Sequence, residues 1–293
     1  MFDTRKGEAL LAVIDSGSFE QAAALLHLTP SAVSQRVSAL EAALGTPLLI
    51  RSKPARATPA GQRLLQYLRR SRLLEAEFAA DSSDGPLSVA LAVNNDTLAT
   101  WLLPGLAPFL IAERLLLDIT VDDQDHTYAL LAQGLALAGV SSEAAPMRGC
   151  DAQPLGSMRY RLLASPGFAQ RWFPAGLTRA AARVAPLMVF DRKDTLQASF
   201  LLRELGLPAG SYPCHYVPAS EAFLSAIRLG LGYGMVPELQ FASLVDDGAL
   251  VDLAPATPTD IALYWHAWRV QSPKFERLSV ALVAAARARL RQP

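Results

Sequence analysis

The sequence lacks the features that mark disulfide-rich, membrane-spanning and secreted proteins. It has only two cysteines in 293 residues, Cys150 and Cys214, which form neither a disulfide framework nor a set of metal ligands. Charged residues and prolines interrupt every apolar run well before the roughly 18 residues that a transmembrane helix needs. The N-terminal stretch MFDTRKGEALLAVIDSGS contains three acids and no clean apolar segment, which argues against a secretory signal. We therefore expect a cytoplasmic protein that has no membrane partner, metal or other cofactor.

A surplus of charge of one sign is also absent, because 27 Lys and Arg balance 27 Asp and Glu. The balance hides an asymmetry, since residues 1–80 contain ten basic and seven acidic residues whereas residues 81–293 contain 17 and 20. The positive surplus of the first segment is weak support for a polyanionic partner. Low-complexity tracts are missing too, and a chain of this length with 51% hydrophobic residues is expected to form two or three globular domains.

The pattern of the chain changes at DSSDGP, residues 81–86, a cluster of turn-forming residues that marks a linker. The first eighty residues read as helices. Beyond the linker, short β-rich runs such as LSVALAV, LLLDITV, PLMVF and IALYWHAW alternate with segments of helical period such as TLATWLLPGLAPFL. This alternation predicts open α/β sheets arranged as two small lobes.

The stretch TPSAVSQRVSALE has the pattern of a helix with one apolar and one polar face. Thr29 is a plausible N-cap, and Pro30 suits the first helical position, where its missing N–H costs nothing. Small hydroxyl and amide groups on the outer face suit a helix that lies in the DNA major groove and bonds to base edges. The apolar stripe contains Val33, Val37, Leu40 and Leu44, and the opposite face carries Ser31, Ser34, Gln35 and Ser38.

A second helical pattern, SFEQAAALLHL, lies directly upstream, with Ser18 as its expected N-cap. The intervening HLT is short enough for a helix-turn-helix. On these residues alone, an ordinary amphipathic helix with a polar face is an equal alternative.

The segment TPLLIRSKPARATPAGQRLL favours the DNA-binding interpretation. Two short extended runs, residues 48–51 and 55–58, flank a turn, and no acid lies between Glu41 and Glu75. A basic hairpin after a helix-turn-helix is typical of a wing that contacts phosphates and the minor groove. The basic residues of this wing are Arg51, Lys53 and Arg56.

A long helix is predicted to begin at Thr58 and Pro59 and to extend to about Ala80. We expect its apolar stripe to lack a partner within its own domain and to pair with a second copy of the chain. The stripe contains Leu64, Leu65, Leu68, Leu74 and Phe78.

FEQAAALLHLTPSAVSQRVSALEAALGTPLLIR and ATPAGQRLL together resemble the winged helix-turn-helix of the LysR-type transcriptional regulators. The rest of the chain is similar to one branch of that family, the ArgP/LysG regulators of basic amino acid export and metabolism, some of which are labelled chromosome replication initiation inhibitors. The segments that carry the closer resemblance are LAVNNDTLATWLLPGLAPFL, PLMVFD, PCHYVPASEAF and LYWHAW.

The resemblance implies an α+β protein of several domains. A winged helix-turn-helix DNA-binding domain would occupy residues 1–57, and a dimerisation linker helix with a hinge would occupy residues 58–85. Residues 86–293 would form an α/β effector-binding domain of two periplasmic-binding-protein-like lobes, lobe I at about 86–156 and 262–293 and lobe II at about 157–261. The implied partners are double-stranded promoter DNA, a small-molecule effector, a homodimer through the linker helix within a homotetramer, and RNA polymerase.

For function, the resemblance implies a regulator, activator or repressor, that senses L-lysine or L-arginine. A LysR-type regulator that responds to a different small molecule is the alternative. The wing SKPARATPA is richer in proline and alanine than the family pattern, which leaves open which basic side chain enters the groove. Carried over by position, the base readers would be Ser31, Ser34, Gln35 and Arg36, and the wing contacts would be Arg51, Lys53 and Arg56.

The effector site is expected at the carboxyl ends of strands, where ligands collect in open α/β sheets. After LAVNN, Asp96 and Thr97 open a helix whose first amides, with the Thr97 hydroxyl and the Asn95 amide, could bind an amino acid carboxylate. Asp96 itself is either an N-cap or a contact for the ligand ammonium. Trp101 and Trp265 either form a wall of the pocket or belong to the core.

A cationic side chain needs acceptors in a sheltered site, because an unpaired buried charge costs several kcal/mol. Acids at predicted strand ends are the candidates, although for each one a loop or capping role is the more ordinary reading. They are Asp122 and Asp123 after LLLDITV, Asp191 after PLMVF and Glu221 in VPASEAF, with Ser141 as a neutral neighbour.

Three other functional classes fit the sequence less well. No nucleophile elbow, phosphate-cradling glycine loop or metal triad is found, so an enzyme is not expected. A transport-type solute-binding protein is disfavoured by the winged domain and by the missing secretory signal. An architectural DNA-binding protein that ignores small molecules would give no heat in calorimetry with lysine and arginine.

Overall fold

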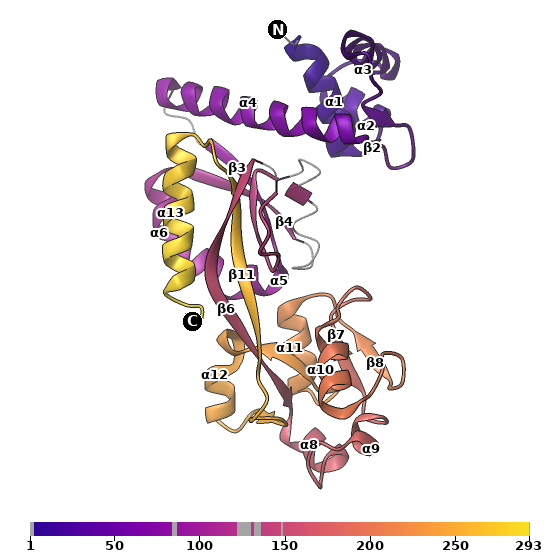
Figure 1. Cartoon of the computed structure of the whole chain (residues 1–293), viewed down its shortest axis with the longest axis vertical. Coiled ribbons are helices and arrows are strands. Elements are labelled where there is room, and N and C mark those ends of the chain that lie inside the picture. The colour runs from indigo at the N-terminus through magenta and orange to yellow at the C-terminus, as the bar shows by residue number, and fades with distance from the viewer. Residues whose placement is uncertain (1–2, 84–86, 122–129, 132–135, 148, 293) are drawn as a thin grey trace.

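The computed structural model describes residues 3–83, 87–121, 130–131, 136–147 and 149–292. Along its longest axis follow an N-terminal helical domain, an upper lobe built around a sheet and a lower lobe (Figure 1). The linker helix α4 (Pro59–Ser83) lies above the upper lobe, and the chain ends near the level at which the two lobes meet (Figure 1). Among the described residues, no helix combines the length and the apolar character needed to cross a bilayer.

The N-terminal domain is a helix-turn-helix whose helix starts are fixed by side-chain caps. Ser18 Oγ and Thr29 Oγ1 each accept a hydrogen bond from a first-turn amide, which confirms both predicted caps. Val33 and Val37 are fully buried, as the predicted apolar stripe requires. The three helices are α1 (Thr4–Ser16), α2 (Phe19–Leu25) and α3 (Pro30–Leu44).

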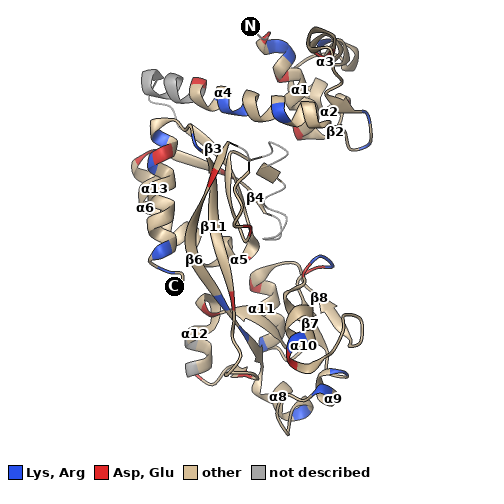
Figure 2. Ribbon diagram, viewed as in Figure 1, with Lys and Arg blue, Asp and Glu red and all other residues tan. Residues whose placement is uncertain are grey.

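A two-stranded wing follows the helix-turn-helix. β1 (Leu49–Ile50) pairs antiparallel with β2 (Arg56–Ala57), in agreement with the predicted hairpin. Figure 2 shows that the loop of this wing, beside β2, carries Lys and Arg. The wing therefore presents positive charge at the end of the N-terminal domain.

The linker helix α4 begins inside the N-terminal core. Leu65 is fully buried and Leu64 is 9% exposed, both packed with residues of the helix-turn-helix. The expectation that the apolar stripe has no partner within its own domain is therefore wrong for the first part of the helix. Farther along, Leu74 is 54% exposed.

The part of the chain after α4 is organised around one seven-stranded sheet in the order β10-β6-β11-β5-β3-β4, with β9 also paired to β6. The strands β3, β4 and β5 run parallel, and β11 joins them antiparallel. β6 and β11 are long enough to pass from the upper lobe into the lower one (Figure 1). The bounds are β3 Leu87–Val93, β4 Leu115–Val121, β5 Ala138–Ser141, β6 Cys150–Ala164, β9 Gly234–Pro237, β10 Val251–Asp252 and β11 Thr259–Trp268.

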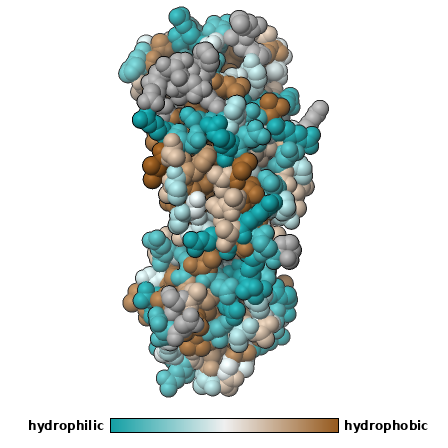
Figure 3. Space-filling view, turned by 90° about the vertical axis from the view of Figure 1, so that its left-hand side faces the viewer, coloured by the Kyte–Doolittle hydropathy of each residue, from teal (hydrophilic) through white to brown (hydrophobic). Residues whose placement is uncertain are grey.

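The helices of the upper lobe form a layer on one side of the sheet. A helix starts as α5 (Asn95–Thr97), widens into a π-helical turn (Leu98–Leu102) and continues as α6 (Leu103–Ala112), which lies beside α13 (Pro273–Arg287) (Figure 1). Ile111 and Val280 are 77% and 66% exposed on these two helices. Figure 3 views this side of the molecule and shows hydrophobic residues among hydrophilic ones.

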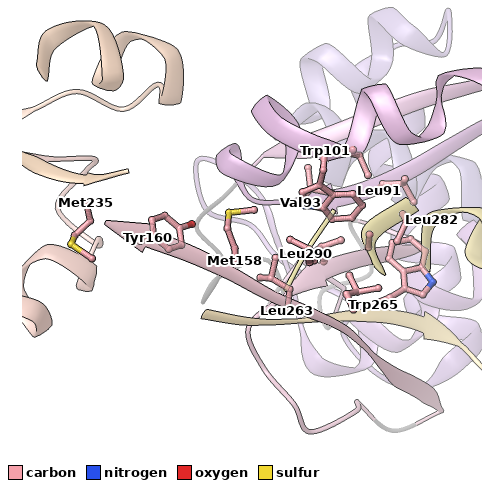
Figure 4. Close-up of a cluster of buried hydrophobic side chains, with 14 of the residues drawn as sticks. Leu91, Val93, Trp101, Met158, Tyr160, Met235, Leu263, Trp265, Leu282 and Leu290 are labelled. Carbon is pink, nitrogen blue, oxygen red and sulfur yellow. The ribbon is translucent and has the colours of Figure 1, made fainter. Parts of the chain in front are cut away.

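Trp101 and Trp265 lie in the core of the upper lobe, each 2% exposed, and not in a ligand pocket (Figure 4). The interpretation of these residues as pocket walls is therefore wrong. Their indole rings pack among Leu91, Val93 and Leu282 (Figure 4), where burial of aromatic surface stabilises the contact between helices and sheet.

The lower lobe surrounds a small parallel pair of strands. β7 (Leu187–Val189) pairs with β8 (Cys214–Tyr216), and Leu187 also bridges to Tyr233, next to β9. The helices of this lobe are α8 (Pro166–Trp172), α9 (Arg179–Ala182), α10 (Leu196–Leu205), α11 (Ser220–Arg228) and α12 (Glu238–Asp246).

Where the two lobes meet, the register between β6 and β11 shifts at Leu263 and Tyr264. Gly156 adopts φ +123° beside this shift, a conformation that side chains rarely adopt. The backbone of Arg291, near the end of the chain, exchanges two hydrogen bonds with Ser157. The C-terminal residues are thus attached to the strand that connects the lobes.

Candidate DNA-reading face and effector pocket

The outer face of α3 presents the side chains that the sequence predicts. Ser31 and Gln35 are exposed, and Ser34 and Arg36 are half-buried, while the valines opposite them are buried. The helix therefore has one face anchored in the domain and one polar face available to a groove.

Arg51, in the wing, contacts this helix directly. Its Nη1 donates to Ser34 Oγ over 3.2 Å and its Nη2 to Ser38 Oγ over 3.1 Å. The guanidinium carbon also lies 5.2 Å from the centre of the Phe19 ring. Lys53 and Arg56 by contrast are exposed, with no salt bridge or side-chain hydrogen bond to any other described residue.

A pocket lies between the two lobes, at the carboxyl end of β3. It has an empty volume of about 560 Å³, part of which opens to solvent. One side comes from residues 94–96 and the other from α10, α11 and the start of α12. Its lining comprises two carboxylates (Asp96, Asp194), two hydroxyls (Tyr160, Ser220), four amides (Asn94, Asn95, Gln197, Gln240) and five apolar residues (Phe190, Leu196, Phe223, Met235, Pro237).

Asp96, in the upper lobe, accepts hydrogen bonds from the strand between the lobes and from the lower lobe. The Tyr160 hydroxyl on β6 donates to Asp96 Oδ2 over 2.7 Å, and the Ser220 hydroxyl at the start of α11 donates to Oδ1. The N-cap is Asn94, whose Oδ1 accepts from the Thr97 amide over 3.1 Å, so the capping interpretation of Asp96 is wrong. Asp96 is therefore left to face the pocket.

Burial raises the pKa of the Asp96 carboxyl above its ordinary value. The hydrogen bonds from Ser220 and Tyr160 oppose this rise, and the nearby charge of Asp194 adds to it. A cation that enters the pocket would favour the charged form of Asp96 by the same electrostatics.

Asp194, the second acid of the pocket, also organises the loop after β7. Its Oδ1 accepts from the amide of Leu196 over 2.8 Å, and its Oδ2 accepts from the amide of Phe190 over 3.1 Å. Gln197 lies next to it and accepts from the Met235 amide over 2.8 Å. Asp194 is therefore fixed with its carboxylate at the pocket.

Of the predicted effector residues, Asn95 and Asp96 line the pocket, and the other described ones do not. Asp191 Oδ1 accepts from the amides of Lys193 and Asp194, so this carboxylate caps a turn. The prediction that Asp191 contacts the ligand is therefore wrong. Asp123 lies outside the described residues, as does Asp122.

Three further predicted residues lie outside the pocket. Glu221 is exposed and lines a separate groove with Arg228. Ser141 is fully buried at the end of β5, and its Oγ accepts from the Glu143 amide over 3.1 Å. Thr97 is fully buried next to Asp96, with no hydrogen-bond partner for its hydroxyl among the described residues.

No local sequence pattern predicts the pocket residues contributed by the lower lobe and by β6. Tyr160 lies in the middle of a long strand, and Gln197, Phe223 and Gln240 lie on helix faces that read as ordinary amphipathic surface. Only Asp194, three residues after Asp191 in the same loop, could have been chosen as an equivalent acid.

The electrostatic character of the pocket follows from this inventory. Its described lining contains two acids and no Lys, Arg or His. An anionic ligand such as a dicarboxylate would be repelled, whereas a cationic ligand would be attracted. Nowhere in the described part of the chain do three His, Cys, Asp or Glu side chains group so as to bind a metal ion.

Both parts of the chain match known protein families. Residues 5–62 match the bacterial regulatory helix-turn-helix proteins of the lysR family, and residues 80–287 match the LysR substrate binding domain. The HTH-type transcriptional regulator ArgP of Aeromonas salmonicida is 44% identical over 286 residues, which is 96% of each chain. ArgP of Klebsiella pneumoniae is 42% identical over 292 residues, covering 99% of this chain and 98% of its own.

Solved structures agree over the full length. ArgP from Mycobacterium tuberculosis superimposes with a TM-score of 0.85 at 40% identity and covers 100% of both chains. The full-length regulator LysG from Corynebacterium glutamicum with bound effector Arg gives a TM-score of 0.78 at 36% identity, covering 99% of this chain and 100% of its own. The chain therefore belongs to the LysR family of DNA-binding transcriptional regulators, in the branch that contains ArgP and LysG, and not to a family of enzymes.

Proposed function

We propose that this regulator senses L-lysine or L-arginine in the pocket between its lobes and controls genes for the export or metabolism of basic amino acids. The observation that carries the proposal is the placement of Asp96 and Asp194 in a pocket whose described lining has no positive side chain. A sheltered carboxylate without a counter-charge is costly, so a cationic ligand fits this pocket best.

Lysine and arginine carry two cationic groups, and the pocket has two carboxylates. Asp96 can accept more than the bonds from Tyr160 and Ser220, because each carboxylate oxygen has two acceptor positions. Asp194 also has acceptor capacity beyond its hydrogen bonds from the amides of Phe190 and Leu196 and from the Gln197 side chain. The α-ammonium and the side-chain cation can therefore each find an acid.

The carboxylate and the methylene stem of such a ligand also find complementary groups. Helix α11 begins after Ala219, whose methyl side chain cannot accept a hydrogen bond from the first-turn amides. These amides can therefore donate to a ligand carboxylate. Phe190, Phe223 and Met235 form apolar walls for the stem.

Related proteins support the same class of effector. LysG of Corynebacterium glutamicum has been solved with arginine as its bound effector, and the fold of this chain matches that structure over its full length. Relatives from several bacteria at 41–44% identity are ArgP regulators. A response of this LysR-type regulator to another small cation is the alternative.

For DNA, we propose that the outer face of α3 reads bases in a promoter while the wing contacts phosphates. The exposure of Ser31 and Gln35 and the solvent-facing side chains of Lys53 and Arg56 support these roles. Ser34 and Arg36 complete the proposed reading face, and Arg51 joins it to the wing.

The exposed apolar residues support assembly into larger units. Leu74 on α4 is 54% exposed, and a second α4 would cover it, which supports a dimer through the linker helix. Ile111 on α6 and Val280 on α13 are exposed apolar residues on two helices that lie side by side, and they suit a contact between dimers in a tetramer. Such a tetramer would act on promoter DNA in the cytoplasm and contact RNA polymerase.

Ligand binding would act by changing the populations of lobe and subunit arrangements. Asp96 belongs to the upper lobe and Ser220 to the lower one, so a ligand between them favours one relative position of the lobes. Only an effector that binds one arrangement more tightly than the other changes how the four DNA-binding domains engage a promoter.

Thermal unfolding of the full-length protein with each of the twenty amino acids tests the proposal. A ligand at about 100 times its Kd stabilises by roughly 2.7 kcal/mol, which we expect for lysine or arginine. Citrulline and norleucine are matched controls, because they keep the shape of arginine and lysine without the side-chain charge. Equal responses to arginine and citrulline would contradict the proposed cation site, and a response only to other amines would support the alternative effector.

A further inference from the structure

Arg51 joins three elements of the N-terminal domain. It follows β1 in the wing, donates from Nη1 and Nη2 to Ser34 and Ser38 on α3, and lies over the ring of Phe19 on α2. The two serines are one helical turn apart, so the planar guanidinium spans them with its two terminal nitrogens. Because Arg51 is exposed, this arrangement stands on the surface that is proposed to contact DNA.

The other two basic residues of the wing have no such contacts. Lys53 and Arg56 are exposed, and neither has a salt bridge or side-chain hydrogen bond to another described residue. They are free to follow phosphates, whereas the position of Arg51 is fixed by two neutral hydroxyls and a ring. A phosphate contact would not require these three partners.

We propose that Arg51 is a positioning residue for base recognition, and not simply a phosphate contact of the wing. It sets the hydroxyl of Ser34 and the angle between the wing and α3. This inference rests on the proposed role of Ser34 in reading bases.

The chemistry of the two groups gives the proposal its direction. A guanidinium has only donors, so the Ser34 oxygen must accept from Arg51, and the Ser34 proton is then available to an acceptor. In the major groove, guanine N7 and O6, adenine N7 and thymine O4 are acceptors, whereas the amino groups of adenine and cytosine are donors. Arg51 therefore biases Ser34 toward a base that presents an acceptor.

The test uses the full-length protein and selection of binding sites from randomised DNA. Arg51→Lys keeps the charge but lacks the planar fork, and Arg51→Gln removes the charge. Both variants should lose roughly 5- to 150-fold of the discrimination at the position that Ser34 reads. Arg56→Gln is the matched control, because it should keep the base preference and lower the slope of log K against log salt by about 0.9.

The contrary results are distinct. If Arg51→Lys and Arg51→Gln keep the wild-type base preference, and Arg51→Gln lowers the salt slope as Arg56→Gln does, Arg51 is a phosphate contact and the inference is overturned. Ser34→Ala separates this failure from a failure of the reading face, because an unchanged preference in Ser34→Ala removes Ser34 itself as a reader. The inference would also be overturned if the loss of base discrimination in the double variant Arg51→Lys/Ser34→Ala equalled the sum of the losses in the two single variants. Positioning requires that the effects of the two residues are coupled.

Discussion

Ser220, in the first turn of α11, donates a hydrogen bond to Asp96, which lies in the other lobe at the carboxyl end of β3. Tyr160, on the strand that passes between the lobes, donates to the second oxygen of the same carboxylate. One acid thus connects both halves of the effector domain. A ligand cation that binds Asp96 would therefore act on a direct contact between the two lobes.

The first prediction concerns Asp96→Asn. The amide keeps the shape and can bond to both hydroxyls, since Ser220 and Tyr160 can accept as well as donate. The fold should be retained, whereas affinity for arginine and lysine should fall by at least about tenfold because the counter-charge is lost. Calorimetry measures this loss, and DNA affinity without effector should stay nearly unchanged.

Asp191→Asn is the matched control for that experiment. Asp191 precedes Asp194 by three residues but caps a turn outside the pocket. It should keep wild-type affinity for arginine. Equal losses in Asp191→Asn and Asp96→Asn would mean that the cation site is misplaced.

The second prediction is a dependence of stability on pH that passes through Asp96. Burial, with the charge of Asp194, raises its pKa in the folded protein, so the folded state holds this proton to higher pH than the unfolded state. The stabilisation is complete below the ordinary pKa of an aspartate and is lost as the pH rises through the raised pKa. Thermal unfolding from about pH 4 to 8 should show that Asp96→Asn lacks this loss.

Arginine binding should show the opposite dependence. The charged carboxylate binds the cation, so affinity should fall as the pH decreases below the raised pKa of Asp96. A profile in Asp96→Asn that parallels the wild type, for stability and for binding, would assign the pH dependence to other groups.

Local patterns predicted much of the fold. The apolar runs LSVALAV and LLLDITV coincide with β3 and β4 at both ends, and Ser18 and Thr29 are the caps that their positions suggested. The start of β6 has no such local pattern, because Pro154 and Gly156 are residues that strands seldom contain. They lie at the register shift opposite Tyr264, where a strand tolerates both residues.

The pocket could be predicted only in part, because it is formed by contacts between distant segments. The position of Asp96 after a predicted strand was enough to place it at the site. Its partners Tyr160 and Ser220, however, are 64 and 124 positions away along the chain. Periodicity within a segment carries no information on such pairings. The acids chosen in the lower lobe show the same limit, since Asp191 lies in the correct loop but only Asp194 faces the pocket.

The third prediction concerns Gly156, at the boundary of the lobes. A Cβ at this position would lie 2.7 Å from the carbonyl oxygen of Arg291, in addition to the strain of φ +123°. Gly156→Ala should lower stability by about 1–3 kcal/mol from the backbone conformation, and the clash should add to this. Urea unfolding measures the difference.

Gly167→Ala is the matched control, because a Cβ there meets no atom within 4 Å and the residue lies in α8. Alanine is favoured over glycine in a helix, so this variant should be as stable as the wild type or slightly more stable. Equal stability of Gly156→Ala would contradict both the backbone strain and the clash with Arg291.

The last prediction tests the proposed dimer through α4. Leu74 is 54% exposed, and Leu202 on α10 in the lower lobe is 56% exposed, so the two residues differ in position but hardly in exposure. Leu74→Asp would place a charge in an apolar dimer contact and should raise the dimer dissociation constant at least about tenfold, because burying an unpaired carboxylate is costly. Leu202→Asp should leave the assembly unchanged. Sedimentation over a range of concentrations separates the two variants, and a Leu74→Asp protein that stays as strongly associated as Leu202→Asp would exclude this part of α4 from the dimer contact.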